Sequence, residues 1–142
     1  VAASARHGEL PPLVVELDGA LMRSSILAES LLRIARTDPA RLLSLALRLI
    51  DGRRAFKEKL AANASLQVAA LPYRESLVEY LRQQRMRGRR VVLATSAHVS
   101  SARDVAAHLG LFDDVLATEG DTDLRGHAKL AACRERVGPA FV

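Results

Sequence analysis

Two carboxylates stand two positions apart in Glu16 and Asp18, directly after the apolar run 13–15 and directly before Gly19. A β-branched run of this kind predicts a buried strand. The carboxyl ends of parallel strands form the edge at which open α/β folds bind their ligands. We therefore expect a functional site at this edge of a sheet.

A hydroxyl and a lysine are expected at the same edge. Residues 90–95 are predicted to form a second buried strand, which ends in Thr95 and is followed by Ser96. A hydroxyl at this position could bind a phosphoryl oxygen. Lys129 falls in the first turn of a predicted helix over 127–137, where its charge opposes the helix dipole. Because a bound anion would offset that mild cost, Lys129 is predicted to contact a ligand rather than only solvent.

Strands and helices alternate along the second half of the chain. Strands are predicted over 90–95 and 114–118, and helices over 75–88, 99–109 and 127–137, the last two ended by Gly110 and Gly138. This alternation implies parallel βαβ units.

The fifty or so residues after the first strand follow a different, helical pattern. A stripe formed by Leu27, Leu31 and Ile34 recurs with helical period. Asp38 and Pro39 then predict the cap and first position of a second helix that runs to Gly52, and a third helix is predicted over 54–63. Residues 1–10 are predicted to be a loose lead-in.

The order of these features resembles the haloacid dehalogenase-like (HAD) superfamily of phosphatases. Residues 13–21 resemble its first motif, Thr95 and Ser96 its second, and residues 124–129 its third. The resemblance implies an α/β fold: a Rossmann-like parallel sheet formed by residues 1–23 and 73–142, with a helical cap over 24–72 inserted after the first strand. Among HAD domains, the sequence is similar to those that precede UbiA-type membrane prenyltransferases.

The resemblance also implies a chemistry and a set of roles. In relatives an aspartate attacks a phosphoryl group, a carboxylate two residues later serves as acid and base, and Mg²⁺ offsets the charge repulsion. Carried over, Glu16 and Asp18 are the catalytic residues, and the carboxylate of Glu16 and the backbone carbonyl of Asp18 are the metal ligands. Thr95, Ser96 and Lys129 would bind the phosphate of a small phosphorylated substrate.

Two departures from the family pattern weaken the catalytic prediction. Glu16 stands where relatives have the nucleophilic aspartate, and its extra methylene moves the carboxylate by roughly 1 Å, enough to cost about a hundredfold in rate. Relatives also carry a fourth motif, a strand ending in Gly-Asp, and this chain reaches Val142 where such a strand would begin. We expect a C-terminally incomplete core, impaired hydrolysis, and a weak or incomplete Mg²⁺ site.

Three other functions compete with an impaired phosphatase. The first is a non-catalytic phosphate-binding or regulatory domain fused to a membrane prenyltransferase. A response-regulator-like receiver has a comparable acidic pocket but lacks room for the helical insertion, and a dehalogenase would need the missing aspartate. The sequence does not name the substrate.

Composition restricts the partners. The net charge of +5 could suggest nucleic acid, but three Phe, two Tyr and no Trp leave little for base stacking, so we predict no nucleic-acid partner. The apolar stretch 42–50 is too short and too interrupted to cross a membrane. One cysteine, Cys133, and the lack of an apolar signal core indicate a cytoplasmic domain. It could be tethered through its C-terminus to a membrane domain, at the cytoplasmic face of the inner membrane.

The remaining reactive side chains are predicted to be structural. They comprise acidic turn residues expected to be solvated caps (Glu119, Asp121, Asp123), ordinary histidines (His98, His108), a core cysteine (Cys133), helix-capping serines (Ser24, Ser25) and arginines near a helix C-terminus (Arg82, Arg85, Arg87, Arg89, Arg90).

Overall fold

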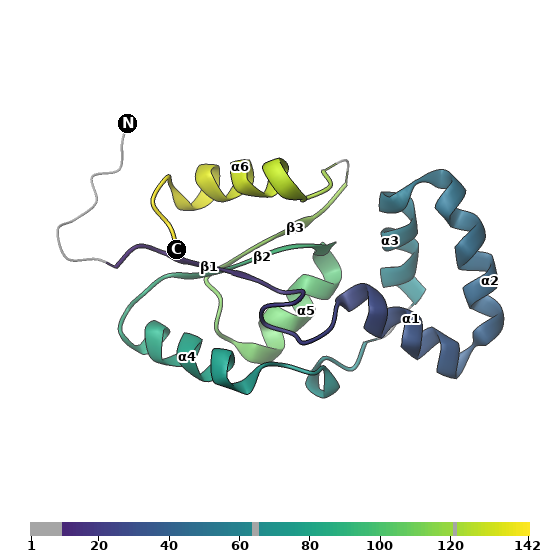
Figure 1. Cartoon of the computed structure of the whole chain (residues 1–142), viewed down its shortest axis with the longest axis horizontal. Coiled ribbons are helices and arrows are strands. Elements are labelled where there is room, and N and C mark those ends of the chain that lie inside the picture. Colours follow the sequence, from purple (N-terminus) through teal and green to yellow (C-terminus); the bar gives the residue numbers. More distant parts are fainter. Residues whose placement is uncertain (1–9, 64–65, 121) are drawn as a thin grey trace.

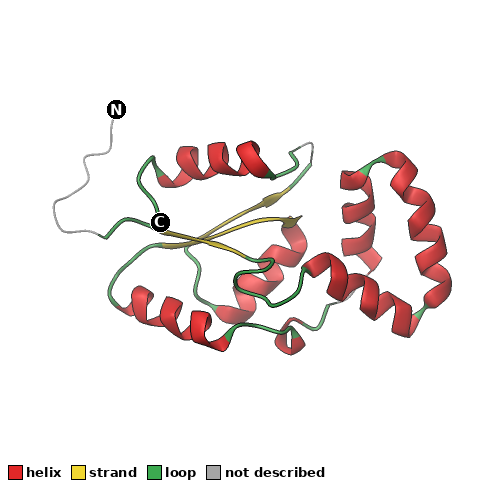
Figure 2. Cartoon of the chain, viewed as in Figure 1, coloured by secondary structure: helices red, strands yellow, loops and turns green. Residues whose placement is uncertain are grey.

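A three-stranded parallel sheet forms the centre of the molecule (Figure 2). The structure is a computed structural model that describes residues 10–63, 66–120 and 122–142. The strands are β1 (Leu13–Glu16), β2 (Val91–His98) and β3 (Asp114–Thr118), in the order β1-β2-β3. The predicted lead-in over 1–10, apart from Leu10, and Asp121 lie outside the described residues.

Helices cover both faces of the sheet (Figure 1). Helices α4 (Glu75–Met86) and α5 (Val99–Leu109) lie on one face, and α6 (Gly126–Val137) lies on the other. Buried apolar side chains of β1 and β2 pack against α4 and α5, while Val92, Leu116 and Cys133 belong to a second cluster under α6. The chain leaves α5 through Gly110, whose φ of 63° a residue with a side chain rarely adopts.

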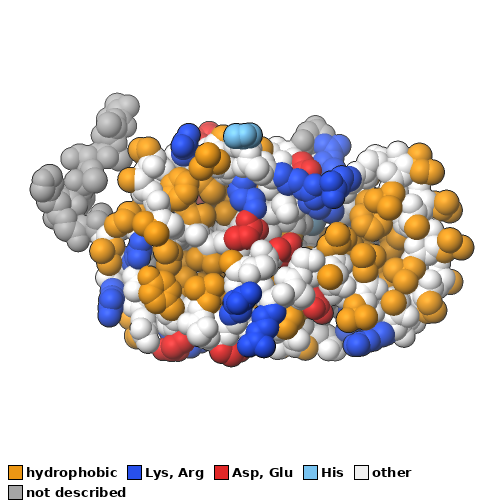
Figure 3. All heavy atoms as spheres, in the orientation of Figure 1, with side chains coloured by type: hydrophobic (Ala, Val, Ile, Leu, Met, Phe, Trp, Pro, Cys, Tyr) orange, Lys and Arg blue, Asp and Glu red, His pale blue; other side chains and the backbone are white. Residues whose placement is uncertain are grey.

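Three helices and a short 3₁₀ turn follow β1, and we call them the cap. They are α1 (Ile26–Thr37), α2 (Pro39–Leu47), η1 (Arg48–Asp51) and α3 (Arg53–Asn63); a second 3₁₀ turn, η2 (Val68–Ala70), precedes the return to the core. The cap has its own small core of Ile34, Leu45, Phe56 and Leu60. Hydrophobic side chains also cover much of its visible surface (Figure 3).

The second cap helix differs from the prediction in two details. It tightens into a 3₁₀ turn at Arg48 instead of remaining α-helical to Gly52. Asp38 is the N-cap residue, but its side chain makes no capping hydrogen bond and pairs instead with Arg41 at 2.9 Å. Pro39 supplies the start of this helix without that bond, because its φ is already helical.

The chain passes between core and cap through two adjacent segments. Met22 forms an antiparallel bridge with Tyr73, and Arg74 N–H donates to Leu21 O at 2.9 Å. The structure therefore confirms the predicted fold class, a parallel α/β sheet with helices inserted after the first strand. The division at residues 23 and 73 remains a prediction.

Strand β1 forms backbone hydrogen bonds along both of its edges. Leu13 N–H donates to Arg90 O at 2.9 Å, on the side of β2, while Val14 N–H donates to Val142 O at 2.8 Å on the other side. Val142 N–H in turn donates to Pro12 O at 3.0 Å. In the described part of the chain, no helix is long and apolar enough to span a bilayer.

Several residues predicted to be structural are so. Cys133 is buried, and the Ser25 hydroxyl accepts from Ala28 N–H at the start of α1. Two of the arginines near the end of α4 have partners elsewhere in the chain. Arg85 pairs with Asp113 at 3.3 Å, and Arg89 Nε donates to Pro11 O at 2.7 Å.

Candidate active site

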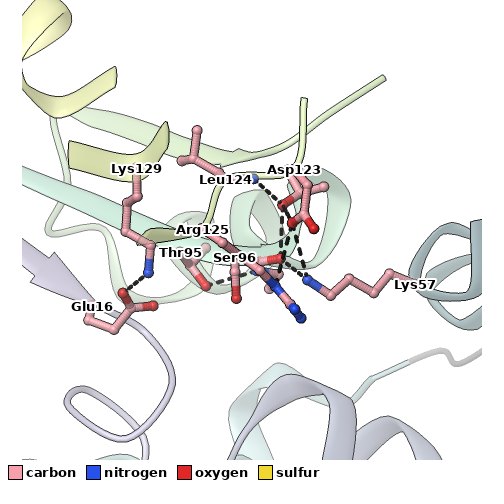
Figure 4. Close-up of polar contacts among 10 residues, drawn as sticks. Glu16, Lys57, Thr95, Ser96, Asp123, Leu124, Arg125 and Lys129 are labelled. Atoms are coloured by element: carbon pink, nitrogen blue, oxygen red, sulfur yellow. Dashed lines mark hydrogen bonds and ion pairs between the residues drawn. The ribbon is translucent and has the colours of Figure 1, made fainter. Parts of the chain in front are cut away.

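Glu16 and Lys129 meet at the carboxyl edge of the sheet (Figure 4). Glu16 ends β1, Lys129 lies in the first turn of α6, and the Lys129 ammonium donates to Glu16 Oε2. The side chains are 34% and 23% exposed, so the pair is partly screened from water. The predicted catalytic carboxylate and the predicted phosphate-binding lysine are thus in direct contact.

Asp18 lies in the turn that follows β1. Backbone bonds from Leu21 N–H to Glu16 O and from Met22 N–H to Leu17 O, 3.1 and 2.9 Å long, hold this turn in place. Asp18 Oδ1 accepts from Ile26 N–H at 3.1 Å, which ties the turn to the start of α1.

The pKa of Asp18 is raised above its ordinary value. Burial is the main cause, and the charge of Glu16 raises this pKa further. The hydrogen bond from Ile26 and the positive charges of Lys129 and Lys57 act in the opposite direction. A carboxyl group with a raised pKa holds its proton more readily near neutral pH, as a general acid requires.

Thr95 and Ser96 occupy β2 at the same edge, but they are placed differently. Thr95 is fully buried, and its hydroxyl accepts from Ala97 N–H at 3.1 Å. This bond shapes the irregular end of β2, where the pairing with β3 shifts between Ala94 and His98. Ser96 lines a cavity. Of the two predicted phosphate-binding hydroxyls, the one on Ser96 is therefore better placed to meet a ligand.

A lysine that sequence reasoning missed reaches this edge from the cap. Lys57, on α3, donates to Ser96 O at 2.7 Å and lies 3.6 Å from Asp123 Oδ1 (Figure 4). Its side chain is only 12% exposed, and this burial lowers the pKa of its ammonium. A signal was present in the sequence, since Lys57 lies beside the apolar positions Phe56 and Leu60 of the same helix.

Asp123 is more than the solvated cap that the sequence predicts, and that prediction is wrong. Its Oδ1 atom lies 3.6 Å from both Lys57 Nζ and Arg125 Nε. It also lies within reach of the Thr118 hydroxyl, which donates to Ser96 O at 2.9 Å and accepts from Leu124 N–H. The loop before α6 is thereby connected to the end of β2 and to the cap.

A cavity of about 180 Å³ separates the cap from the sheet edge. Its polar lining includes Asp18, Ser25, Lys57, Ser96, His98 and Arg125. His98 is the N-cap residue of α5, where its Nδ1 atom accepts from Ser100 N–H at 3.2 Å, as befits a structural histidine. Glu16 and Lys129 lie outside this lining, so Asp18 is the one predicted catalytic residue among the described residues that line the cavity.

The side chains present match Mg²⁺ in kind but not in number. Oxygen atoms are the ligands that Mg²⁺ prefers, and the predicted ones are the carboxylate of Glu16 and the backbone carbonyl of Asp18. However, Glu16 Oε2 is engaged by Lys129 and Asp18 Oδ1 by Ile26. Among the described residues no group of three or more potential ligands is gathered at one point. The fit is therefore incomplete.

Comparison with known proteins defines the class. The family model of haloacid dehalogenase-like hydrolases matches residues 5–139. The chain belongs to this family, whose members typically use Mg²⁺ and act on phosphorylated substrates.

The chain is also similar to one curated protein in sequence and to two solved structures in fold. The chain is 37% identical over 131 residues to an uncharacterized protein, y4nM, of Sinorhizobium fredii; the match covers 92% of this chain and 25% of that protein. The chain thus spans about a quarter of this relative's length. The fold is similar to that of a Bordetella pertussis protein of unknown function (20% identity, TM-score 0.52, 78% of this chain and 60% of that one). The fold is also similar to that of an L-2-haloacid dehalogenase, at 18% identity and a TM-score of 0.50. This match covers 94% of this chain and 77% of that one.

Proposed function

We propose that this chain binds the phosphoryl group of a small phosphomonoester at the carboxyl edge of its sheet, and that it hydrolyses the ester only weakly. The observation that carries the proposal is the contact of the Lys129 ammonium with Glu16, beside the partly buried carboxyl of Asp18. Ser96 and Thr95 complete the proposed site, Ser96 at the cavity wall and Thr95 as support for the strand end.

In the proposed hydrolysis, Glu16 is the nucleophile and Asp18 is the general acid and base. An oxygen of Glu16 forms a bond to phosphorus while the bond to the leaving oxygen breaks, and Asp18 gives its proton to that oxygen. Asp18 then takes a proton from the water that cleaves the acyl phosphate. Lys129 offsets the negative charge of Glu16 and of the phosphoryl oxygens throughout. The carboxylate of Glu16 and the backbone carbonyl of Asp18 would hold Mg²⁺, which would supply further positive charge when bound.

Glu16 is one of two reasons for proposing weak turnover, and the incomplete set of Mg²⁺ ligands among the described residues is the other. The carboxylate of Glu16 lies one methylene further from the backbone than the aspartate of relatives. A displacement of roughly 1 Å can cost about a hundredfold in rate. Binding depends less on the position of one nucleophilic atom, so it is expected to outlast the chemistry.

A second candidate is a phosphate-binding or regulatory domain that makes no turnover at all. The Glu16–Lys129 pair favours it, because an ammonium held by a carboxylate can retain an anion-binding role without any nucleophilic attack. For this second candidate, we propose that the attached partner is a membrane prenyltransferase.

Hydrolysis of p-nitrophenyl phosphate with and without Mg²⁺ separates these proposals. We expect the unmodified chain to turn over slowly, and Asp18→Asn to remove whatever rate exists. A rate equal to that of Asp18→Asn favours the second candidate. Rapid, Mg²⁺-dependent turnover by the unmodified chain would contradict the proposed weakness and make Glu16 a competent nucleophile.

A further inference from the structure

The cavity between cap and core has a cationic wall that the proposed hydrolysis does not use. Lys57 and Arg125 both line it, and both lie 3.6 Å from one oxygen of Asp123. Asp123 itself is not part of the lining. Among the described residues, these two cations share the one carboxylate of Asp123 behind them, so this wall has one more positive than negative side chain.

The burial of Lys57 strengthens the argument for an anionic ligand in this cavity. An ammonium group is costly to remove from water unless charged or hydrogen-bonding partners replace the solvent. Lys57 is 12% exposed, and its described partners are the neutral carbonyl of Ser96 and the shared carboxylate of Asp123. Of the three N–H donors of an ammonium, one contacts Ser96 O and one can face Asp123. The third is left for a ligand in the cavity.

The position of the wall relative to Asp18 determines what part of a ligand would reach it. Asp18 lines the same cavity. In the proposed reaction it gives a proton to the leaving oxygen, so the leaving group lies on the cavity side of the phosphoryl group. Apart from Asp18, the described residues that line the cavity include no other carboxylate to repel an anion, and Ser30 and Ser101 also belong to the lining.

We propose that Lys57 and Arg125 form a subsite for a second anionic group, carried by the leaving group of the substrate. The substrate class is then a compact phosphomonoester with a carboxylate or a second phosphate on its alcohol. This inference rests on the proposed function, because it takes the phosphoryl group to lie at Glu16, Asp18 and Lys129. Lys57 is thus a specificity residue contributed by the cap.

A purely structural role makes a different prediction. If Lys57 only fastens α3 to Ser96, its loss would destabilise the cap and weaken every ligand to the same degree. If it recognises a second anion, its loss would weaken only those ligands that carry one. A matched pair of ligands distinguishes the two roles.

The experiment measures the binding of two phosphonates that cannot be hydrolysed. 3-Phosphonopropionate and propylphosphonate differ in a carboxylate against a methyl group, and both are titrated calorimetrically at one fixed Mg²⁺ concentration; the next longer homologues are titrated in the same way. We expect the unmodified chain to bind the phosphonocarboxylate about tenfold more tightly or better, as a charge-assisted contact provides. Lys57→Met is expected to bring the ratio of affinities near one, and Lys57→Arg to retain the preference.

Two further variants make the result interpretable. Lys59→Met changes an exposed lysine of the same helix and should keep the preference for the phosphonocarboxylate. Lys129→Met should weaken both phosphonates alike, which tests the phosphoryl site itself. Equal affinities for the two phosphonates in the unmodified chain, with both weakened by Lys129→Met, would overturn the subsite and leave the proposed function standing. No binding of either phosphonate, or no effect of Lys129→Met, would overturn both.

Discussion

The ammonium of Lys129 contacts the carboxylate of Glu16, which stands 113 positions earlier in the chain. A lysine in the first turn of a helix opposes the helix dipole, and here the carboxylate at the end of β1 offsets that cost. A phosphoryl group entering this site would therefore share the ammonium with Glu16. The contact also explains how α6 is held at the same edge of the sheet as the turn containing Asp18.

Glu16→Asp is expected to restore little hydrolysis by itself. The shorter side chain would return the nucleophile to the position that relatives use. However, the predicted ligands are still only the carboxylate at position 16 and the backbone carbonyl of Asp18, for a cation that wants about six oxygens, and the described residues gather no group of three or more His, Cys, Asp or Glu side chains around it. Turnover of p-nitrophenyl phosphate by the variant should stay within about tenfold of the unmodified rate. A gain of several orders of magnitude would show that residue 16 alone limits the reaction.

Asp18→Asn is expected to stabilise the fold at neutral pH. Because the pKa of Asp18 is raised in the folded chain, the stability that its protonated form contributes is present in acid and lost as pH rises through this pKa. Asparagine cannot ionise, and its Oδ1 atom can still accept from Ile26 N–H. The variant's Tm should exceed that of the unmodified chain at pH 7, and the difference should shrink towards pH 4.

An exposed aspartate provides the control for this measurement. Asp104, on α5, is exposed, so Asp104→Asn should show no comparable gain at pH 7. A lower Tm for Asp18→Asn at pH 7 would contradict the argument that burial of Asp18 costs stability.

Magnesium is expected to bind weakly. The predicted ligands are the carboxylate of Glu16, one oxygen of which already contacts Lys129, and the backbone carbonyl of Asp18. Water would therefore have to fill most of the coordination shell. Calorimetric titration should give a dissociation constant in the millimolar range, about −4 kcal/mol of binding free energy. Tight, stoichiometric binding would mean that further ligands take part.

Tyr73→Phe is expected to increase the free energy of unfolding by about 1 to 3 kcal/mol. The Tyr73 hydroxyl is buried, and no described residue accepts or donates a hydrogen bond to it. Burial also raises the pKa of Tyr73 to about 12, so the hydroxyl stays neutral. Phenylalanine preserves the stacking on His108, whose ring centroid lies 6.0 Å away.

Chemical denaturation of Tyr73→Phe, compared with Tyr80→Phe, measures this effect. Tyr80 lies on α4 and is 44% exposed, so its hydroxyl can bond to water and its removal should be nearly neutral. Destabilisation by Tyr73→Phe would show that the hydroxyl has a partner in solution.

Local patterns were sufficient to predict the elements of the core. The strand over 114–118 and the helix over 99–109 have the predicted bounds, because an apolar run and Gly110 mark their limits. The convergence of Glu16 and Lys129 was also predictable, since parallel strands and the helices that follow them bring their ends to one edge.

The network around Lys57 could not be predicted in the same way. Its contacts with Ser96 and Asp123 join residues 39 or more positions apart, and they depend on how the cap lies over the core. In sequence, Lys57 is one of several charges on α3, and Asp123 is an acidic residue in a turn. For Thr95 the sequence predicts a ligand contact that the structure does not favour. A threonine at the end of a strand can bind a ligand or form a hydrogen bond with nearby backbone, and the sequence does not distinguish the two.

The phosphoryl site at Glu16, Asp18 and Lys129 is tested most directly by the affinity for inorganic phosphate. The measurement is an NMR titration of the unmodified chain, Lys129→Met and Lys59→Met under identical conditions. We predict that phosphate shifts the amide resonances around Asp18 and Ser96, that Lys129→Met weakens binding about tenfold or more, and that Lys59→Met leaves it unchanged. Equal phosphate affinity in all three chains, or shifts confined to residues away from this edge, would contradict the account.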